Sequence, residues 1–466
     1  MFRIVTLGAI AVLLLYLLFL WPPIGMANNG DFGRLIWTFG MEAENRGQPD
    51  EFYNYLNLRY RFTTERLGFF ESFTSEYITI LPALFLHLLF GKDGWFDIRM
   101  MGFVHAATLF SAFALFLPLI EPWPARRRTL AALTAIFVFC DLYYLQLCNS
   151  FYSDAGAVFY LLLFAAACAR LTLLNTHPRL HTTIAFLSGA MFASSKGQHA
   201  PLGLFVIAAL YLLRHKLTAR WPMGAALVAL GMIAALATTP RSYSATAFYN
   251  VLFHGILPQV DSPEQTLQSF RLDPALARYK GTHTYSPDSG MRDGAVKDAI
   301  TAQASMPRLA AYYLVHPLIA AEHIRRAMRE TSEQRVIGFA NLPKMPHLRV
   351  RWTSHAFSFW SDAKRFTFYR KAWPYFAWCL FCLAAAVVCT RRHPLVLTLA
   401  AASLTALAIG SLADVLDGIR HLTIFTTMGD LMLFTALLSC HPHSNLTPTT
   451  NPTPPTNPTA TTEPRP

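Results

Sequence analysis

Charged residues are scarce in this chain of 466 residues, because Asp, Glu, Lys and Arg together make up only 14% of it. Soluble domains carry about 25% charged residues. This deficit, with 53% hydrophobic residues, excludes an ordinary soluble domain and indicates a protein that lies in a lipid bilayer. The charges that remain are mostly basic, with a formal net charge of +12. In a membrane protein this excess predicts basic cytoplasmic loops and a surface that faces lipid phosphates, and no nucleic-acid motif accompanies it.

Several catalytic and cofactor motifs are absent as well. The chain has no Walker loop, no zinc-type Cys/His pattern and no Ser/His/Asp nucleophile spacing. It also lacks the glycine fingerprint of a Rossmann fold, which argues against a soluble nucleotide-sugar donor. The seven cysteines lie in or beside apolar segments and form no paired set in a loop, so a disulfide framework is not expected.

Ten apolar runs are long enough to span a membrane, and they predict an all-α polytopic membrane protein of about ten transmembrane helices. The runs fall at about 4–21, 98–120, 129–148, 155–174, 182–197, 200–213, 221–239, 373–390, 395–413 and 421–440. The first ends in Trp-Pro-Pro rather than in a cleavage site, so we expect an uncleaved helix. An eleventh run, 76–91, is ambiguous. If it does not span, the short basic clusters all fall on the cytoplasmic side, so we interpret it as an amphipathic helix at the outer interface.

This topology predicts four regions. Residues 1–239 form an N-terminal transmembrane module with a first outer loop at 22–97. Residues 240–372 form a large extracytoplasmic loop domain, and 373–440 form the C-terminal transmembrane helices. Residues 441–466 are a Thr/Pro/Asn-rich tail, which is expected to be disordered. The large loop carries 18 Lys and Arg against 10 Asp and Glu, so its surface suits either a phosphate-bearing substrate or lipid headgroups.

Polar side chains collect on the turns that this topology places on the outer side. The turn after the first span contains Asn29, Asp31 and Arg34, and Glu71 and Glu76 flank the interfacial helix. The other turns contribute Asp154, then Lys196, Gln198 and His199, then Arg420 and His421. Ionisable groups at membrane depth are costly and usually functional. Snorkelling or helix capping is the structural alternative for each one, as for Asp154 directly after Ser153. A carboxylate beside basic groups suits attack of an acceptor on an activated lipid phosphate, with a polyprenyl phosphate or diphosphate as leaving group.

The order of these motifs resembles the GT-C superfamily of integral-membrane glycosyltransferases, which includes the protein O-mannosyltransferases and the lipid A aminoarabinose transferase. In that family a catalytic or near-catalytic Asp follows the first span, and Asp31 in "NNGDFGR" matches it. The remaining matches are Glu71 or Glu76 before the interfacial helix, Arg99 at the second span, Asp154, Ser195 to Gln198, and Arg420 to Leu422. The Pro pair and the Lys of the family's interfacial segment are missing, and residues 240–372 match no relative.

The resemblance implies transfer of a sugar from a polyprenyl-phosphate carrier to an acceptor on the extracytoplasmic side of a bacterial inner membrane. It implies that Asp31 is the general base or orients the acceptor, assisted by Asp154. The donor phosphate would be bound by Lys196, Arg420, His421 and Arg34. Further substrate contacts would come from Asn29, Glu71, Glu76, Gln198 and His199. A divalent ion, Mg or Mn, held by Asp31, Asp154 and Glu76 is left open.

Two other functions compete with this one. A transporter or flippase of lipid-linked sugars would use the same basic surface, but we detect neither midspan ionisable pairs nor a two-half repeat. A non-catalytic scaffold of envelope assembly is the third hypothesis.

Overall fold

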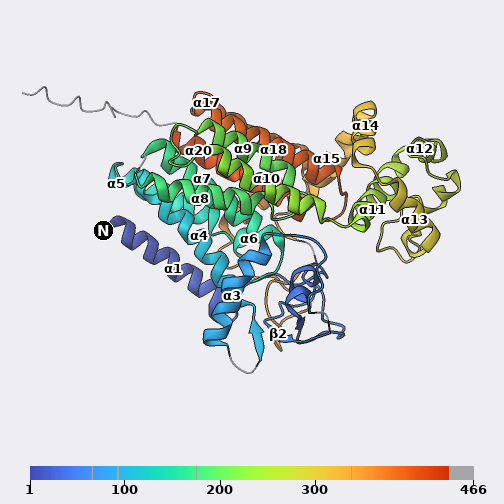
Figure 1. Cartoon of the computed structure of the whole chain (residues 1–466), viewed down its shortest axis with the longest axis horizontal. Helices are drawn as coiled ribbons and strands as arrows, with labels where there is room; N and C mark the ends of the chain where they lie inside the picture. The colour runs from blue at the N-terminus through green and yellow to red at the C-terminus, as the bar shows by residue number, and fades with distance from the viewer. Residues whose placement is uncertain (66, 92–93, 175, 337, 440–466) are drawn as a thin grey trace, which may run out of the picture.

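Helices form most of the computed structural model, which describes residues 1–65, 67–91, 94–174, 176–336 and 338–439. The predicted tail 441–466 lies outside the described residues. Figure 1 shows one elongated bundle with a helical lobe, α11 to α14, at its right end and a small sheet below it.

Each of the ten apolar runs forms a helix of the bundle. These helices are α1 (Phe2–Phe19), α4 (Arg99–Ile120), α5 (Ala125–Phe139), α7 (Ser153–Leu173), α8 (Pro178–Ala193), α9 (Gly203–Leu212), α10 (Trp221–Ala237), α17 (Ala372–Cys389), α18 (Pro394–Leu412) and α20 (Thr423–Ser439). By length and composition, α1, α4, α7, α17 and α18 can cross a membrane, and α10 with the chain after it makes a sixth candidate bent by 71°. The count of ten spans is therefore not confirmed, because α5, α8, α9 and α20 have only 10 to 17 residues.

The predicted span 129–148 is interrupted, because α5 ends at Phe139 and a short helix, α6 (Leu142–Leu145), follows it. Asp141 causes the break. One of its carboxylate oxygens accepts the backbone N–H of Tyr143 at 2.8 Å, which caps α6. The other accepts the N–H groups of Trp360 and Ser361 at 2.9 and 3.0 Å. Asp141 is thus hydrogen-bonded to a segment more than 200 residues away in the sequence, and hydrophobic periodicity cannot predict such a contact.

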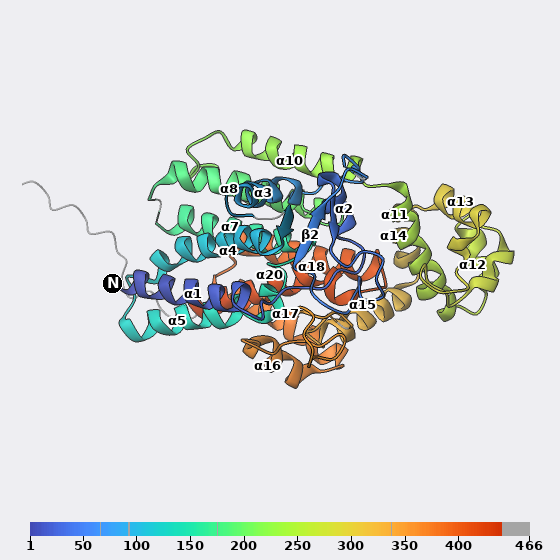
Figure 2. The same ribbon diagram turned by 90° about the horizontal axis from the view of Figure 1, so that it is seen from below.

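One end of the bundle collects the N-terminus, the turn between α4 and α5, and the end of α20. Arg3 pairs with Glu121 at 2.9 Å, and Arg127 donates to the backbone oxygen of Leu438 at 3.1 Å. The first loop and the α11–α14 lobe lie toward the opposite end (Figures 1 and 2). We call that opposite end the site end, because the polar turns described below meet there.

The first loop contains a three-stranded antiparallel sheet that the all-α prediction did not include. It consists of β1 (Met41–Ala43), β2 (Arg59–Phe62) and β3 (Trp95–Asp97). Within β2 only Tyr60 is buried, while Arg59, Arg61 and Phe62 are exposed. The short helices α2 (Gly33–Ile36) and η1 (Trp37–Phe39) precede the sheet.

Residues 76–91 form α3 (Glu76–Phe90), which Figure 2 shows nearly end-on while α1, α4 and α7 run along the bundle. Its crossing orientation agrees with an interfacial helix. The helix is not amphipathic in the expected sense, however. Glu76, Thr79, Ile80 and Ala83 form its buried face, yet the opposite face is also apolar, with Ile78, Leu81, Phe85, Leu88 and Leu89 exposed. An exposed apolar face suits contact with lipid chains rather than with water.

Residues 240–372 separate into two parts with different cores. A lobe contains α11 (Arg241–Tyr249), the π-helix Asn250–Ile256, η4 (Leu257–Gln259), α12 (Pro263–Ser269), η5 (Pro274–Tyr279), η6 (Gly290–Arg292), α13 (Gly294–Gln303) and α14 (Met306–Val315), packed around its own apolar cluster. α15 (Pro317–Thr331) then returns to the bundle. The segment after it, including α16 (Phe359–Phe368), contributes Val336, Phe339 and Leu342 to the main core.

A buried ion pair connects α16 to the bundle, contrary to our expectation of no such pair. Lys364 Nζ lies 2.9 Å from Asp430 Oδ2, and Asp430 sits in the middle of α20. The Tyr144 hydroxyl donates to the same carboxylate oxygen at 2.6 Å. Both charged side chains are almost fully buried. Asp430 is the one acidic residue of α20, and it was not among the predicted site residues, although an acidic residue within a span is a signal of function or pairing.

Candidate functional site

The turn that carries Asp31 is held by side-chain amides. Asn28 Oδ1 accepts the N–H groups of Gly30 and Phe32 at 2.8 and 3.2 Å, and Asn29 Oδ1 accepts the N–H of Asp31 at 3.0 Å. Gly30 has φ of +110°, a conformation that favours glycine. These Asx-type bonds fix the backbone and leave the Asp31 carboxylate free to face other elements.

Arg420 lies at the centre of the site, on the short helix α19 (Gly418–His421). Its Nη2 is 2.8 Å from Asp31 Oδ2 and 3.4 Å from Asp154 Oδ2, and its Nη1 is 3.0 Å from Asp417 Oδ2. The guanidinium also stacks on the Tyr152 ring at 4.2 Å. The Arg420 side chain is only 7% exposed. One cation therefore joins three carboxylates from turns that are far apart in the sequence.

Lys196 extends the cluster on the other side of Asp154. Its Nζ lies 3.5 Å from Asp154 Oδ1, and 18% of its side chain is exposed. Next to it, Gln198 and His421 bind each other twice. Gln198 Oε1 is 2.8 Å from His421 Nδ1, and Gln198 Nε2 donates to the backbone oxygen of His421 at 3.2 Å. These bonds fix the turn between α8 and α9 against α19.

Arg34 is the most exposed cation of the site, with 37% of its side chain accessible. It pairs with Asp31 Oδ1 at 3.1 Å and lies 4.1 Å over the ring of Tyr243. The predicted residue Glu71 does not line the cavity described below.

Electrostatics keeps Asp31 ionised. Burial by itself raises the pKa of its carboxyl. Arg420 and Arg34 together lower this pKa by more than burial raises it, so it lies well below its usual range. Burial lowers the pKa of His199 to about 3, so this imidazole is neutral. The site therefore presents an ionised carboxylate beside basic groups throughout the physiological pH range.

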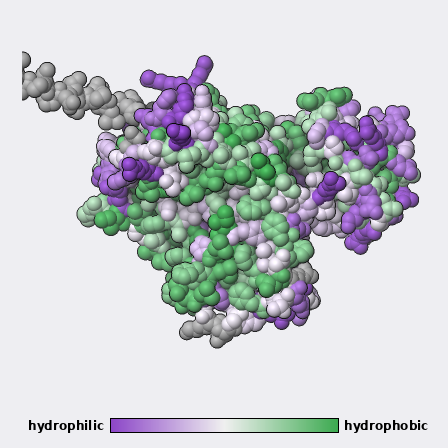
Figure 3. Space-filling view, in the orientation of Figure 1, coloured by the Kyte–Doolittle hydropathy of each residue, from purple (hydrophilic) through white to green (hydrophobic). Residues whose placement is uncertain are grey.

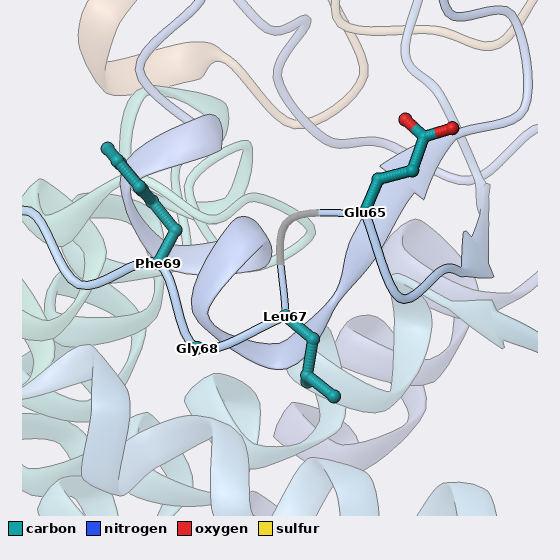
Figure 4. Close-up of a pocket in the computed structure, with 4 residues that line it drawn as sticks. All are labelled: Glu65, Leu67, Gly68 and Phe69. Carbon is teal, nitrogen blue, oxygen red and sulfur yellow. The ribbon is translucent and has the colours of Figure 1, made fainter.

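A cavity of about 1430 Å³ opens in front of this cluster. Among the predicted residues, those that line it are Asn29, Asp31, Arg34, Lys196, Gln198, Arg420 and His421. Apolar side chains line the same cavity, among them Leu236 of α10, Ile409 and Leu412 of α18, and Leu314, Pro317 and Ile324 of α14 and α15. The cavity lining thus combines charged and apolar side chains. A second, shallow pocket of about 390 Å³ is lined by Glu65, Leu67, Gly68 and Phe69 and offers one charged group (Figure 4).

Besides Glu71, three predicted residues do not line the cavity. Asp154 is 1% exposed and lies behind Arg420 and Lys196, so it orients them rather than facing a substrate. Glu76 pairs with His105 at 3.2 Å under α4 and α7. His199 is buried, with its Nδ1 3.0 Å from Ser195 Oγ. Glu76 and His199 were predicted to contact the substrate as polar groups of the outer turns, but both side chains are buried in the core.

The predicted metal triad does not form either. Asp31 and Asp154 both bind Arg420, and Glu76 is held by His105. In the part of the chain that the structure describes, no three His, Cys, Asp or Glu side chains gather where they could hold a metal ion. The guanidinium of Arg420 already occupies the position between the Asp31 and Asp154 carboxylates.

Sequence reasoning missed several residues of the site. Tyr53, Tyr243 and Tyr285 line the cavity around Asp31, and Tyr53 packs edge-on against Phe339 at 5.2 Å. Glu330 of α15 also lines the cavity, and its Oε2 accepts the N–H of Gly418 at 3.0 Å. All except Tyr53 come from residues 240–372, where no motif pointed to the site.

The fold and the apolar helices define an integral membrane protein with a charged site at one end of its bundle. A family model described as the YfdI N-terminal transmembrane domain matches residues 2–447. The chain belongs to this family. No curated protein and no solved structure matches it significantly.

Proposed function

We propose that this protein is a glycosyltransferase of GT-C type that moves a sugar from a polyprenyl-phosphate carrier to an acceptor. The observation that carries the proposal is a cavity lined by both charged and apolar side chains. Asp31, Lys196 and Arg34 line it, and so do aliphatic side chains of the helices around it. A lipid-linked phosphate sugar likewise combines a charged head with a hydrocarbon chain. The location proposed with it is the extracytoplasmic face of a bacterial inner membrane, because the basic clusters predict a cytoplasmic opposite end.

In the proposed reaction an acceptor oxygen attacks C1 of the sugar while the bond from C1 to the phosphate oxygen breaks. The electron pair of that bond leaves with the carrier phosphate, and the proton of the acceptor passes to the Asp31 carboxylate. A carboxylate with so low a pKa is a weak base. It therefore takes the proton late, when bonding to C1 has made the acceptor oxygen strongly acidic. Before that, Asp31 orients the acceptor hydroxyl by accepting its hydrogen bond.

Lys196 and Arg34 are the cations best placed to bind the leaving phosphate. Both line the cavity, and each is held by a single site carboxylate. Arg420 was expected to share this role, but three carboxylates already surround it and its side chain is 7% exposed. We therefore assign to Arg420 the positioning of Asp31, and to Lys196 and Arg34 the stabilisation of the charge that develops on the phosphate.

The test uses the purified protein in proteoliposomes with a polyprenyl-phosphate sugar labelled in the sugar and an extract of envelope glycans as acceptor. We expect Asp31→Asn to lower the transfer rate by about 100-fold or more, since general base and orienting roles contribute about 10²- to 10⁴-fold. Asp298→Asn on the exposed side of α13 is the matched control and is expected to transfer at the wild-type rate. Full activity of Asp31→Asn would refute the role given to Asp31.

A further inference from the structure

The corner between α14 and α15 presents the most exposed aliphatic group of the lobe. Leu314 is 85% exposed, Val315 is 75% exposed and Leu318 is 84% exposed. Tyr312 and His316 stack beside this tip at 4.2 Å. Aliphatic residues flanked by an aromatic side chain with a polar end are typical of a segment that enters a membrane interface.

The position of the corner agrees with that environment. In both views α14 lies nearer to the bundle than α12 and α13, which form the far side of the lobe (Figures 1 and 2). Figure 3 shows hydrophobic surface at the top of the lobe, where α14 lies, whereas the far side is largely hydrophilic. The exposed face of α10 carries further aliphatic side chains, Leu230, Ile233 and Leu236, and a bundle helix of this kind faces lipid.

The same corner forms part of the cavity wall. Leu314 lines the cavity and is also exposed on the surface, so it stands at an opening. Leu236 at the end of α10 has the same double position, since it lines the cavity and is 51% exposed. Two groups of exposed aliphatic residues therefore reach the cavity lining, one on α10 and one at the corner between α14 and α15. A rim of this kind is suited to hydrocarbon chains and poorly suited to water.

We propose that the tip Leu314, Val315 and Leu318 inserts into the bilayer leaflet at the site end and forms the lipid-side rim through which the hydrocarbon chain of a lipid-linked substrate reaches the cavity. The insertion stands on exposure and position alone, and the passage of a substrate chain rests on the proposed function. The occupant of this surface is lipid, which distinguishes it from a docking site for a second protein.

Photo-crosslinking tests the insertion. Benzoylphenylalanine replaces Leu318 in the full chain, and replaces Lys297 of α13 in the control, because Lys297 is exposed on the far side of the lobe. Both variants are placed in nanodiscs that contain phosphatidylglycerol with an alkyne on its acyl chain. We expect about tenfold more lipid adduct at position 318 than at position 297. Equal labelling at both positions would overturn the insertion, and so would capture of a protein instead of lipid at position 318.

A second experiment tests the passage of the chain. The double variant Val315→Asp and Leu318→Asp removes the apolar tip at exposed positions that the lobe core does not need, and Leu318→Phe keeps it apolar. We expect the Asp variant to raise KM about tenfold or more for a long polyprenyl donor, without a change for a donor of two isoprene units. An unchanged KM for the long donor would overturn the route. If the protein transfers no sugar at all, the proposed function fails, while the crosslinking result still decides the insertion.

Discussion

Removal of the Arg420 charge is expected to destabilise the fold by about 3 to 5 kcal/mol, because breaking a buried ion pair leaves charges without a partner. The perturbation is Arg420→Met, which keeps the length of the side chain. Three carboxylate oxygens lie within 3.4 Å of this guanidinium. Of these residues Asp154 is the most buried, and in the variant it keeps its ion pair with Lys196 but loses the one with Arg420. The expected loss of folding free energy is therefore that of a broken buried ion-pair network, not that of a broken surface pair.

The assay is unfolding by sodium dodecyl sulfate in mixed micelles, followed by circular dichroism at two pH values. In the wild type the folded-state pKa of Asp31 is depressed, so its contribution is present above the unfolded pKa and is lost as the pH falls through the folded pKa. In the variant the carboxylate pKa values rise, so low pH relieves the repulsion. The stability deficit of the variant is therefore expected to shrink between about pH 7 and about pH 4.

The matched control is Arg325→Met, which breaks an exposed pair with Glu322 on α15. Pairs of this kind contribute about 0.2 to 1 kcal/mol. A deficit of the Arg420 variant no larger than that of the control, or a deficit independent of pH, would refute the view that this guanidinium holds the site together.

Three further predictions concern other parts of the molecule. The transfer rate should show no acidic limb from Asp31 between about pH 5 and pH 8, and a limb in that range that disappears in Asp31→Asn would contradict its low pKa. Gly25→Ala should reduce the folded yield in size-exclusion chromatography, because a Cβ at this position would lie 2.6 Å from the backbone oxygen of Asn149; a wild-type elution profile would count against this packing. Lys364→Met should cost about 3 to 5 kcal/mol, and adding Asp430→Asn should recover most of it in a double-mutant cycle; additive losses would mean that the pair is not coupled.

Most of the helices were predictable from the sequence because most of the apolar runs are continuous. The expected run 98–120 corresponds to α4 at Arg99–Ile120, and 373–390 corresponds to α17 at Ala372–Cys389. The error at 129–148 has a physical reason. Asp141 caps α6 locally through Tyr143, but it also accepts hydrogen bonds from residues 360 and 361, and such long-range partners leave no local signal.

The site was partly predictable for a different reason. Turns at the same end of a bundle meet in space, so topology alone brought Asp31, Lys196 and Arg420 together. Which of these side chains face the cavity was not predictable. His199 is one residue from Gln198, yet its ring is buried while Gln198 lines the cavity. The aromatic residues Tyr243 and Tyr285 come from the lobe, whose path back to the site depends on packing that no short motif encodes.

The most direct measurement of the central claim follows both halves of the donor in sealed proteoliposomes, with one label on the sugar and another on the polyprenyl chain. Transfer breaks the bond between them, whereas a transporter moves the donor intact. We predict that sugar-free polyprenyl phosphate appears one for one with labelled glycan, and that Asp31→Asn abolishes both products together. Recovery of the intact donor in the opposite leaflet, with no free carrier phosphate, would contradict the proposed enzyme and favour a transporter.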